Sequence, residues 1–115
     1  MKYKILIIDD EEMILSMMEK CLSDKFLVYT ADSAKRALEL LSATPDIILL
    51  DINMPEMDGL EALREIKKID PGASVVMVSA LGQEARMKEA IIYGAKGFIV
   101  KPFKEEMLIS ALSKL

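Results

Sequence analysis

The sequence contains no histidine, no tryptophan and a single cysteine among its 115 residues. A lone cysteine, Cys21, excludes an intrachain disulfide and fits a reducing compartment, so we expect a cytoplasmic protein. No apolar run approaches the roughly 18 residues that a membrane span needs. The chain begins with a short apolar run followed by acids, which is not the pattern of a signal peptide. The sequence therefore predicts no membrane partner.

Positive charge is also scarce. The 15 lysines and arginines are outnumbered by 19 acids, giving a net charge of -4, and they form no basic stripe. This distribution argues against direct nucleic-acid binding. A chain of 115 residues, 52% of them apolar, is long enough for one domain with its own core, which we expect to span residues 1–115.

Short apolar runs rich in β-branched residues recur along the chain and predict buried strands of a parallel sheet. The clear runs are residues 3–8, 47–50, 75–78 and 98–100, and a weaker one covers residues 26–30. They alternate with helical stretches, which requires right-handed crossovers. We therefore predict an α/β fold, a single flavodoxin-like (βα)5 doubly wound parallel sheet with strand order 2-1-3-4-5.

The helical stretches show apolar residues at helical spacing. In the first helix the predicted buried stripe consists of Ile14, Met17, Met18, Cys21 and Leu22. Further helices are expected from Asp32 or Ser33, from Asp58-Gly59, over residues 83–93 before Gly94, and from about Lys104 to the chain end.

Polar side chains follow the clear strands at the point where each strand ends. They are Asp9 and Asp10, Asp51, Ser79 and Lys101. Because the carboxyl ends of parallel strands meet at one rim, we expect these side chains to lie close together. Oxygen ligands without histidine or cysteine suit Mg²⁺ or Mn²⁺ and disfavour zinc. The sequence thus predicts a site for a divalent cation and a phosphoryl group.

The same residues resemble the receiver domain of two-component response regulators. The motifs are Asp9-Asp10, residues 51–59, Ser79-Ala80 and Lys101-Pro102-Phe103, and the segment 94–103 is similar to CheY-like chemotaxis regulators. The resemblance covers the whole chain, and four motifs in the right order are highly specific. It implies a signalling switch in chemotaxis or transcription regulation, not an enzyme that turns over a free substrate.

The resemblance also implies roles for single residues. Asp51 is the expected phosphoacceptor, assisted by Lys101 and Ser79. The implied ligands of Mg²⁺, or of Mn²⁺ in its place, are Asp10, Asp51 and the backbone carbonyl of Asn53, with Asp9 acting through water.

A conformational switch is implied as well. Ser79 would move toward the phosphoryl group and Phe98 would change its rotamer in response. The peptide bond before Pro102 is expected to be cis. The expected output surface comprises the fourth helix, the fifth strand and the fifth helix, with Met87 and Ile99 as candidate contacts.

The absence of histidine also bears on partners. Any phosphohistidine donor must be another protein, which the resemblance identifies as a sensor histidine kinase or a histidine phosphotransfer protein. An output protein or domain would act downstream, and the receiver would be a monomer or a phosphorylation-dependent dimer.

Three other interpretations remain open at this point. A haloacid-dehalogenase-type phosphatase has a second aspartate two residues after its nucleophile, but Asn53 stands there and cannot transfer the proton. A flavodoxin-like electron carrier needs a phosphate-binding loop after the first strand, where residues 9–12 are all acidic. A degenerate receiver would act by binding only.

Overall fold

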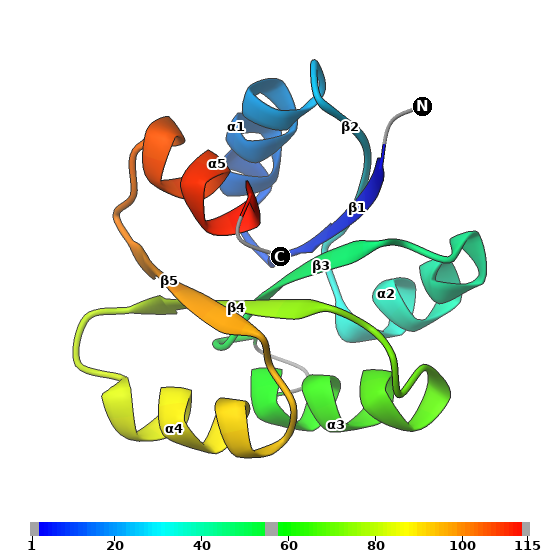
Figure 1. Cartoon of the computed structure of the whole chain (residues 1–115), viewed down its shortest axis with the longest axis vertical. Coiled ribbons are helices and arrows are strands. Elements are labelled where there is room, and N and C mark those ends of the chain that lie inside the picture. The colour runs from blue at the N-terminus through cyan, green and yellow to red at the C-terminus, as the bar shows by residue number, and fades with distance from the viewer. Residues whose placement is uncertain (1–2, 55–57, 114–115) are drawn as a thin grey trace.

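The computed structural model describes residues 3–54 and 58–113 (Figure 1). The strands are β1 (Tyr3–Ile8), β2 (Phe26–Ala31), β3 (Ile47–Asp51), β4 (Val75–Ala80) and β5 (Gly97–Lys101). The helices are α1 (Glu12–Leu22), α2 (Ala34–Leu40), α3 (Gly59–Ile69), α4 (Glu84–Ile92) and α5 (Glu105–Ser113), with a 3-10 turn η1 (Leu41–Ala43) after α2. All five predicted strands are present. The predicted end of the last helix and residues 55–57 of the second motif lie outside the described residues.

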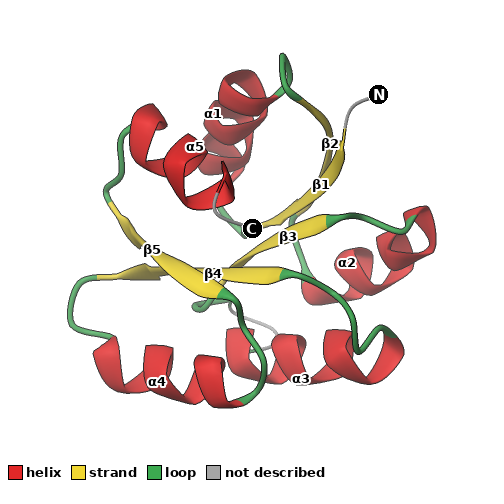
Figure 2. Ribbon diagram, in the orientation of Figure 1, coloured by secondary structure: helices red, strands yellow, loops and turns green. Residues whose placement is uncertain are grey.

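The strands form one parallel sheet in the order β2-β1-β3-β4-β5, which confirms the predicted fold class and strand order. Helices α1 and α5 cover one face of the sheet, and α2, α3 and α4 cover the other (Figure 2). Because β1 and β3 are neighbours while their connections leave in opposite directions, the switch point of the sheet lies at the ends of these two strands.

The central strand β3 explains why the strands read as continuous apolar runs. All five of its residues are buried. Successive side chains point to opposite faces, so Leu49 joins the core beneath α1 and α5 while Leu50 joins the core beneath α2, α3 and α4. A strand covered on both faces has no polar face to alternate with.

The buried face of helix α1 matches the predicted stripe only in part. Its buried residues are Leu15, Met18 and Leu22, whereas Met17 is exposed and Ile14 and Cys21 are only partly buried. Adjacent positions in a helix differ by about 100°, so Met17 is turned away from the sheet that Met18 contacts. The predicted stripe therefore shares Met18 and Leu22 with the buried face but extends beyond one edge of that face.

Cys21 lies on that edge and is partly buried. Burial, followed by the negative charge of Glu105, raises the pKa of its thiol. A protonated, partly buried thiol is a poor nucleophile, which agrees with a packing role.

The partner-contact prediction for Met87 and Ile99 is wrong. Met87 is 4% exposed and packs in the core beneath α2, α3 and α4, and Ile99 is 5% exposed and faces the opposite core. Both side chains point inward because α4 and β5 turn these positions toward the interior. The exposed large apolar side chains of α4, β5 and α5 include Ile91, Ile92, Phe98 and Met107.

The helix ends follow the predicted signals. Ser33 caps α2 by accepting a hydrogen bond from the backbone N–H of Arg36. Asp58 caps α3 in the same way through Leu60. Gly94 follows α4 with φ of 105°, a conformation that favours glycine. Within the described part of the chain, no helix is both long and apolar enough to cross a bilayer.

Candidate functional site

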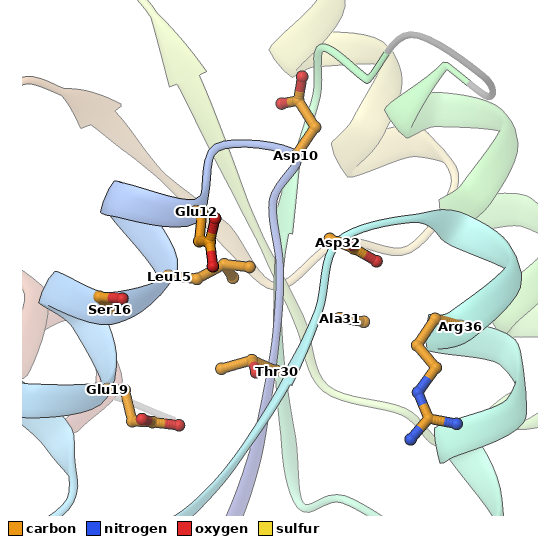
Figure 3. Close-up of a pocket in the computed structure, with 9 residues that line it drawn as sticks. All are labelled: Asp10, Glu12, Leu15, Ser16, Glu19, Thr30, Ala31, Asp32 and Arg36. Carbon is orange, nitrogen blue, oxygen red and sulfur yellow. The ribbon is translucent and has the colours of Figure 1, made fainter.

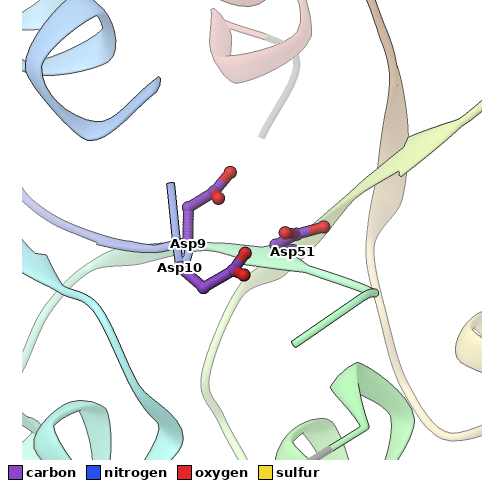
Figure 4. A group of neighbouring side chains, drawn as sticks. All are labelled: Asp9, Asp10 and Asp51. Carbon is purple, nitrogen blue, oxygen red and sulfur yellow. The ribbon is translucent and has the colours of Figure 1, made fainter. Parts of the chain in front are cut away.

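Three carboxylates meet at the switch point of the sheet (Figure 4). Asp9 and Asp10 follow β1, and Asp51 is the last residue of β3. The register pairs Ile8 with Leu50, so the next residues, Asp9 and Asp51, emerge side by side. One carboxylate oxygen from each of the three aspartates lies within 4.8 Å of the others. Asp9 and Asp51 are buried, whereas Asp10 is exposed.

Lys101 brings a positive charge to this group from the end of β5. Its Nζ lies 3.0 Å from Asp9 Oδ2 and 3.8 Å from Asp51 Oδ2. The hydrogen bond of Lys101 therefore goes to Asp9, and its contact with Asp51, the residue that it was expected to assist, is longer. The peptide bond between Lys101 and Pro102 is cis.

The surroundings keep Lys101 protonated. Burial lowers the pKa of the amine, but the hydrogen bond to Asp9 and the charge of Asp51 raise it by more, so the net change is upward. The lysine therefore offers a fixed positive charge beside the acids across the physiological pH range.

The environment of Asp51 strongly raises the pKa of its carboxyl group. Burial is the main cause that raises its pKa to about 6, and the negative charges of Asp9 and Asp10 add to the rise. The hydrogen bond from the Asn53 backbone N–H, 3.1 Å from Asp51 Oδ1, and the charge of Lys101 act in the opposite direction. The carboxylate is mainly ionised at neutral pH, so it can act as a nucleophile, but it is held under repulsion.

These donors fit a hard divalent cation. The cluster consists of oxygen ligands only, and its carboxylates have more negative charge than one lysine neutralises. The backbone of Asn53 also lies at the site, because its N–H contacts Asp51. A cation bound here would lower the repulsion that raises the pKa of Asp51.

The two predicted switch residues lie in different environments. Ser79 is buried near the end of β4, the strand between those that carry Asp51 and Lys101. Phe98 lies on the edge strand β5 and is 52% exposed. Movement of Ser79 and Phe98 remains a prediction.

The contacts of two side chains near the site, Gln83 and Arg86, were not predicted from the sequence. Gln83 accepts a hydrogen bond from the backbone N–H of Ala80 through its side-chain oxygen at 2.9 Å. Arg86 of α4 donates to the side chains of Asn53 and Asp58. Arg86 stands among other charged residues in a helix, and no local pattern shows that it reaches residues about 30 positions away.

A polar hollow of about 430 Å³ lies beside the carboxylate cluster, with Asp10 in its lining. Helix α1 contributes Glu12, Ser16 and Glu19 to one side, and Arg36 of α2 lies across from them (Figure 3). Arg36 is paired with Glu39 at 3.0 Å. The hollow thus extends the negative field of the site and should concentrate cations near Asp10.

Comparison with known proteins decides the family. The family model described as response regulator receiver domain matches residues 5–113. The chain belongs to this family. Receiver-domain relatives include the chemotaxis protein CheY of Listeria monocytogenes, 44% identical over 115 residues that cover 96% of each chain. The CheY of Bacillus subtilis is 42% identical over 99% of this chain and 98% of the relative.

Solved receiver structures share the fold. Chemotaxis protein CheY4 of Vibrio cholerae superposes with a TM-score of 0.93 at 30% identity and covers 99% of this chain and 98% of that one. A receiver domain protein from Clostridium thermocellum gives 0.91 at 33% identity, over 97% and 92% of the two chains. The resemblance to CheY-like receivers that the motifs indicated is confirmed.

Proposed function

We propose that this receiver domain accepts a phosphoryl group on Asp51 in a Mg²⁺-dependent reaction and thereby acts as a signalling switch, catalysing only its own phosphorylation and dephosphorylation. One observation carries the proposal. Asp51 is a buried carboxylate, and one of its oxygens lies within 4.8 Å of carboxylate oxygens of Asp9 and Asp10. Its Oδ2 atom also lies 3.8 Å from the Lys101 amine.

The transfer step is a displacement at phosphorus. An Asp51 carboxylate oxygen attacks, the bond from phosphorus to the donor's imidazole nitrogen breaks, and the electron pair leaves with the imidazole. When bound, Mg²⁺ would neutralise part of the negative charge and orient the transferring oxygens. Asp10, Asp51 and the Asn53 carbonyl would hold the ion, with Asp9 acting through water.

Two further side chains act on the new phosphoryl group. Lys101 pairs with one of its oxygens as a point charge, and the Ser79 hydroxyl donates to another. The modified side chain carries nearly two negative charges in place of one, so contacts that were weak before transfer become strong.

The partners follow from what the chain lacks. Without a histidine of its own, it takes the phosphoryl group from a sensor histidine kinase or a histidine phosphotransfer protein. The relatives named as chemotaxis proteins support a chemotaxis-type role. Output would pass through α4, β5 and α5, where Ile91, Phe98 and Met107 are exposed, to a downstream protein or domain.

The test is the intact mass of the protein after incubation with acetyl phosphate, with Mg²⁺ or with EDTA. We expect a single phosphate adduct that requires Mg²⁺, is absent in Asp51→Asn and is retained in Asp24→Asn, an exposed acid in the turn after α1. No adduct in the wild type under any condition would contradict the proposal and favour a receiver that acts by binding only. Multiple turnover of a phosphomonoester would favour the phosphatase.

A further inference from the structure

An arginine of α4 reaches across to the segment that follows the acceptor strand. Arg86 Nη1 donates to the Asn53 side-chain oxygen at 3.0 Å, and Arg86 Nη2 donates to Asp58 Oδ2 in a short contact. Asn53 lies two residues after Asp51, and Asp58 is the N-cap of α3. One guanidinium thus links α4 to both sides of the connection between β3 and α3.

Both partners of Arg86 make further hydrogen bonds. The Asn53 backbone N–H donates to Asp51 Oδ1 at 3.1 Å, while Asp58 Oδ1 accepts from the Leu60 backbone N–H at 2.7 Å. Asn53 therefore contacts the acceptor through its main chain and contacts Arg86 through its side chain. Two successive hydrogen bonds join the Arg86 guanidinium to the Asp51 carboxylate.

The geometry of the contact is specific to arginine. A guanidinium presents several N–H donors in a rigid plane, so it can hold two acceptors in fixed relative positions, whereas an ammonium is a point charge. The Arg86 and Asp58 side chains are 31% and 41% exposed. An ion pair this open to water contributes little to global stability, so orientation of Asn53 is the larger consequence.

We propose that Arg86 is a positioning residue for phosphoryl transfer: by holding the Asn53 side chain it fixes the Asn53 N–H that orients the Asp51 carboxylate. The role presupposes that Asp51 is the phosphoacceptor. It also gives α4 a direct mechanical link to the acceptor, in addition to the route through Ser79 and β4.

A role of Arg86 as a nearby charge and a role as a positioning residue predict different results for its variants. If Arg86 acted only as a nearby cation, its removal would strengthen Mg²⁺ binding and Arg86→Lys would behave as the wild type. If Arg86 acts by holding Asn53 and Asp58 with its planar guanidinium, lysine cannot replace it. Asn53→Ala removes the side-chain oxygen but keeps the backbone N–H, so it isolates the link between Arg86 and Asn53.

The experiment measures the initial rate of phosphate-adduct formation from acetyl phosphate at saturating Mg²⁺, well below the unfolding midpoint. We expect Arg86→Ala, Arg86→Lys and Asn53→Ala each to slow the reaction about five- to tenfold, the size expected for losing one ordinary hydrogen bond. The Arg86→Ala/Asn53→Ala double variant should be no slower than either single one. Lys88→Ala, an exposed charge removed from the same helix, should match the wild type.

Several results would overturn the role of Arg86 and leave the phosphoacceptor intact. These are a wild-type rate in Arg86→Ala, full rescue by lysine, additive effects in the double variant, or a lower melting temperature with an unchanged rate. Calorimetric titration with Mg²⁺ gives a second readout that does not need the phosphodonor: tighter binding in Arg86→Ala together with a normal rate would identify a charge effect alone. A wild type that forms no adduct would remove both proposals.

Discussion

Replacing Gly59 with alanine should strongly destabilise the protein. A Cβ at this position would lie 2.4 Å from the Ile52 Cα, 2.6 Å from the Asp51 carbonyl oxygen and 2.7 Å from the Ile52 carbonyl oxygen. All three are backbone atoms, and the Gly59 N–H donates to the Ile52 carbonyl at 2.9 Å, so neither segment can yield without breaking the junction. Only a glycine lets the start of α3 approach the end of β3 this closely.

The expected loss is about 3–5 kcal/mol, at the upper end for single substitutions. Domains of this size are commonly stable by about 5–15 kcal/mol, so the variant would lose a large fraction of its free energy of unfolding. Urea unfolding followed by circular dichroism measures the change. Gly97→Ala is the matched control, because a Cβ at Gly97 in β5 meets nothing within 4 Å. Equal midpoints for the two alanine variants would show that the junction relaxes freely.

The ionised carboxylate of Asp51 should destabilise the folded protein at neutral pH. We expect Asp51→Asn to be more stable than the wild type by about 2–3 kcal/mol in EDTA at pH 7.5, or roughly 6–15 °C in melting temperature. The pKa of Asp51 is raised to about 6, mainly by burial and then by Asp9 and Asp10, so ionising it in the folded state is unfavourable. Asparagine keeps the shape and the acceptor oxygen but removes the charge.

The direction of the pH dependence follows from proton binding. Between the unfolded value near 3.8 and the folded value of about 6, the folded state binds more protons at Asp51 than the unfolded state. The contribution of Asp51 to stability therefore falls as pH rises through this window, and the full penalty is present above it. The advantage of Asp51→Asn should grow from pH 4 to pH 7 and then level off.

Thermal unfolding at a series of pH values tests this, with Asp24→Asn as the control for an exposed aspartate. Adding Mg²⁺ should narrow the difference, because the cation stabilises the ionised wild-type site and not the variant's. A gap that is constant with pH, or an asparagine variant that is less stable at pH 7.5, would mean that the ionised Asp51 is not under the repulsion inferred here.

Much of the fold and site was accessible from the sequence because both depend on strand ends. A buried parallel strand is a continuous apolar run, so the first polar residue after it marks the rim, and Asp9, Asp51 and Lys101 were placed in this way. Even the weak run before Ala31 proved to be a strand, since the sheet needed an edge beside β1.

The missed features depend on tertiary geometry. Met87 and Ile99 were assigned to the surface from the element on which they lie, but exposure depends on which way each position faces. The hydrogen bond from Lys101 to Asp9 joins residues 92 positions apart. The hydrogen bonds of Arg86 reach residues about 30 positions away, and both long side chains are flexible. No local spacing predicts which of several acids such a side chain will select.

The position of β3 separates rigidity from responsiveness. It is the middle strand, hydrogen-bonded on both sides and buried throughout, so its amides should exchange with solvent only when the whole domain opens. The phosphoryl group would be added at the end of the segment that yields least. Any change of shape must then appear in the periphery, in α4 and the edge strand β5, where local opening needs less free energy. A rigid acceptor strand and more easily opened peripheral elements would let phosphorylation change the surface of the domain while its core stays folded.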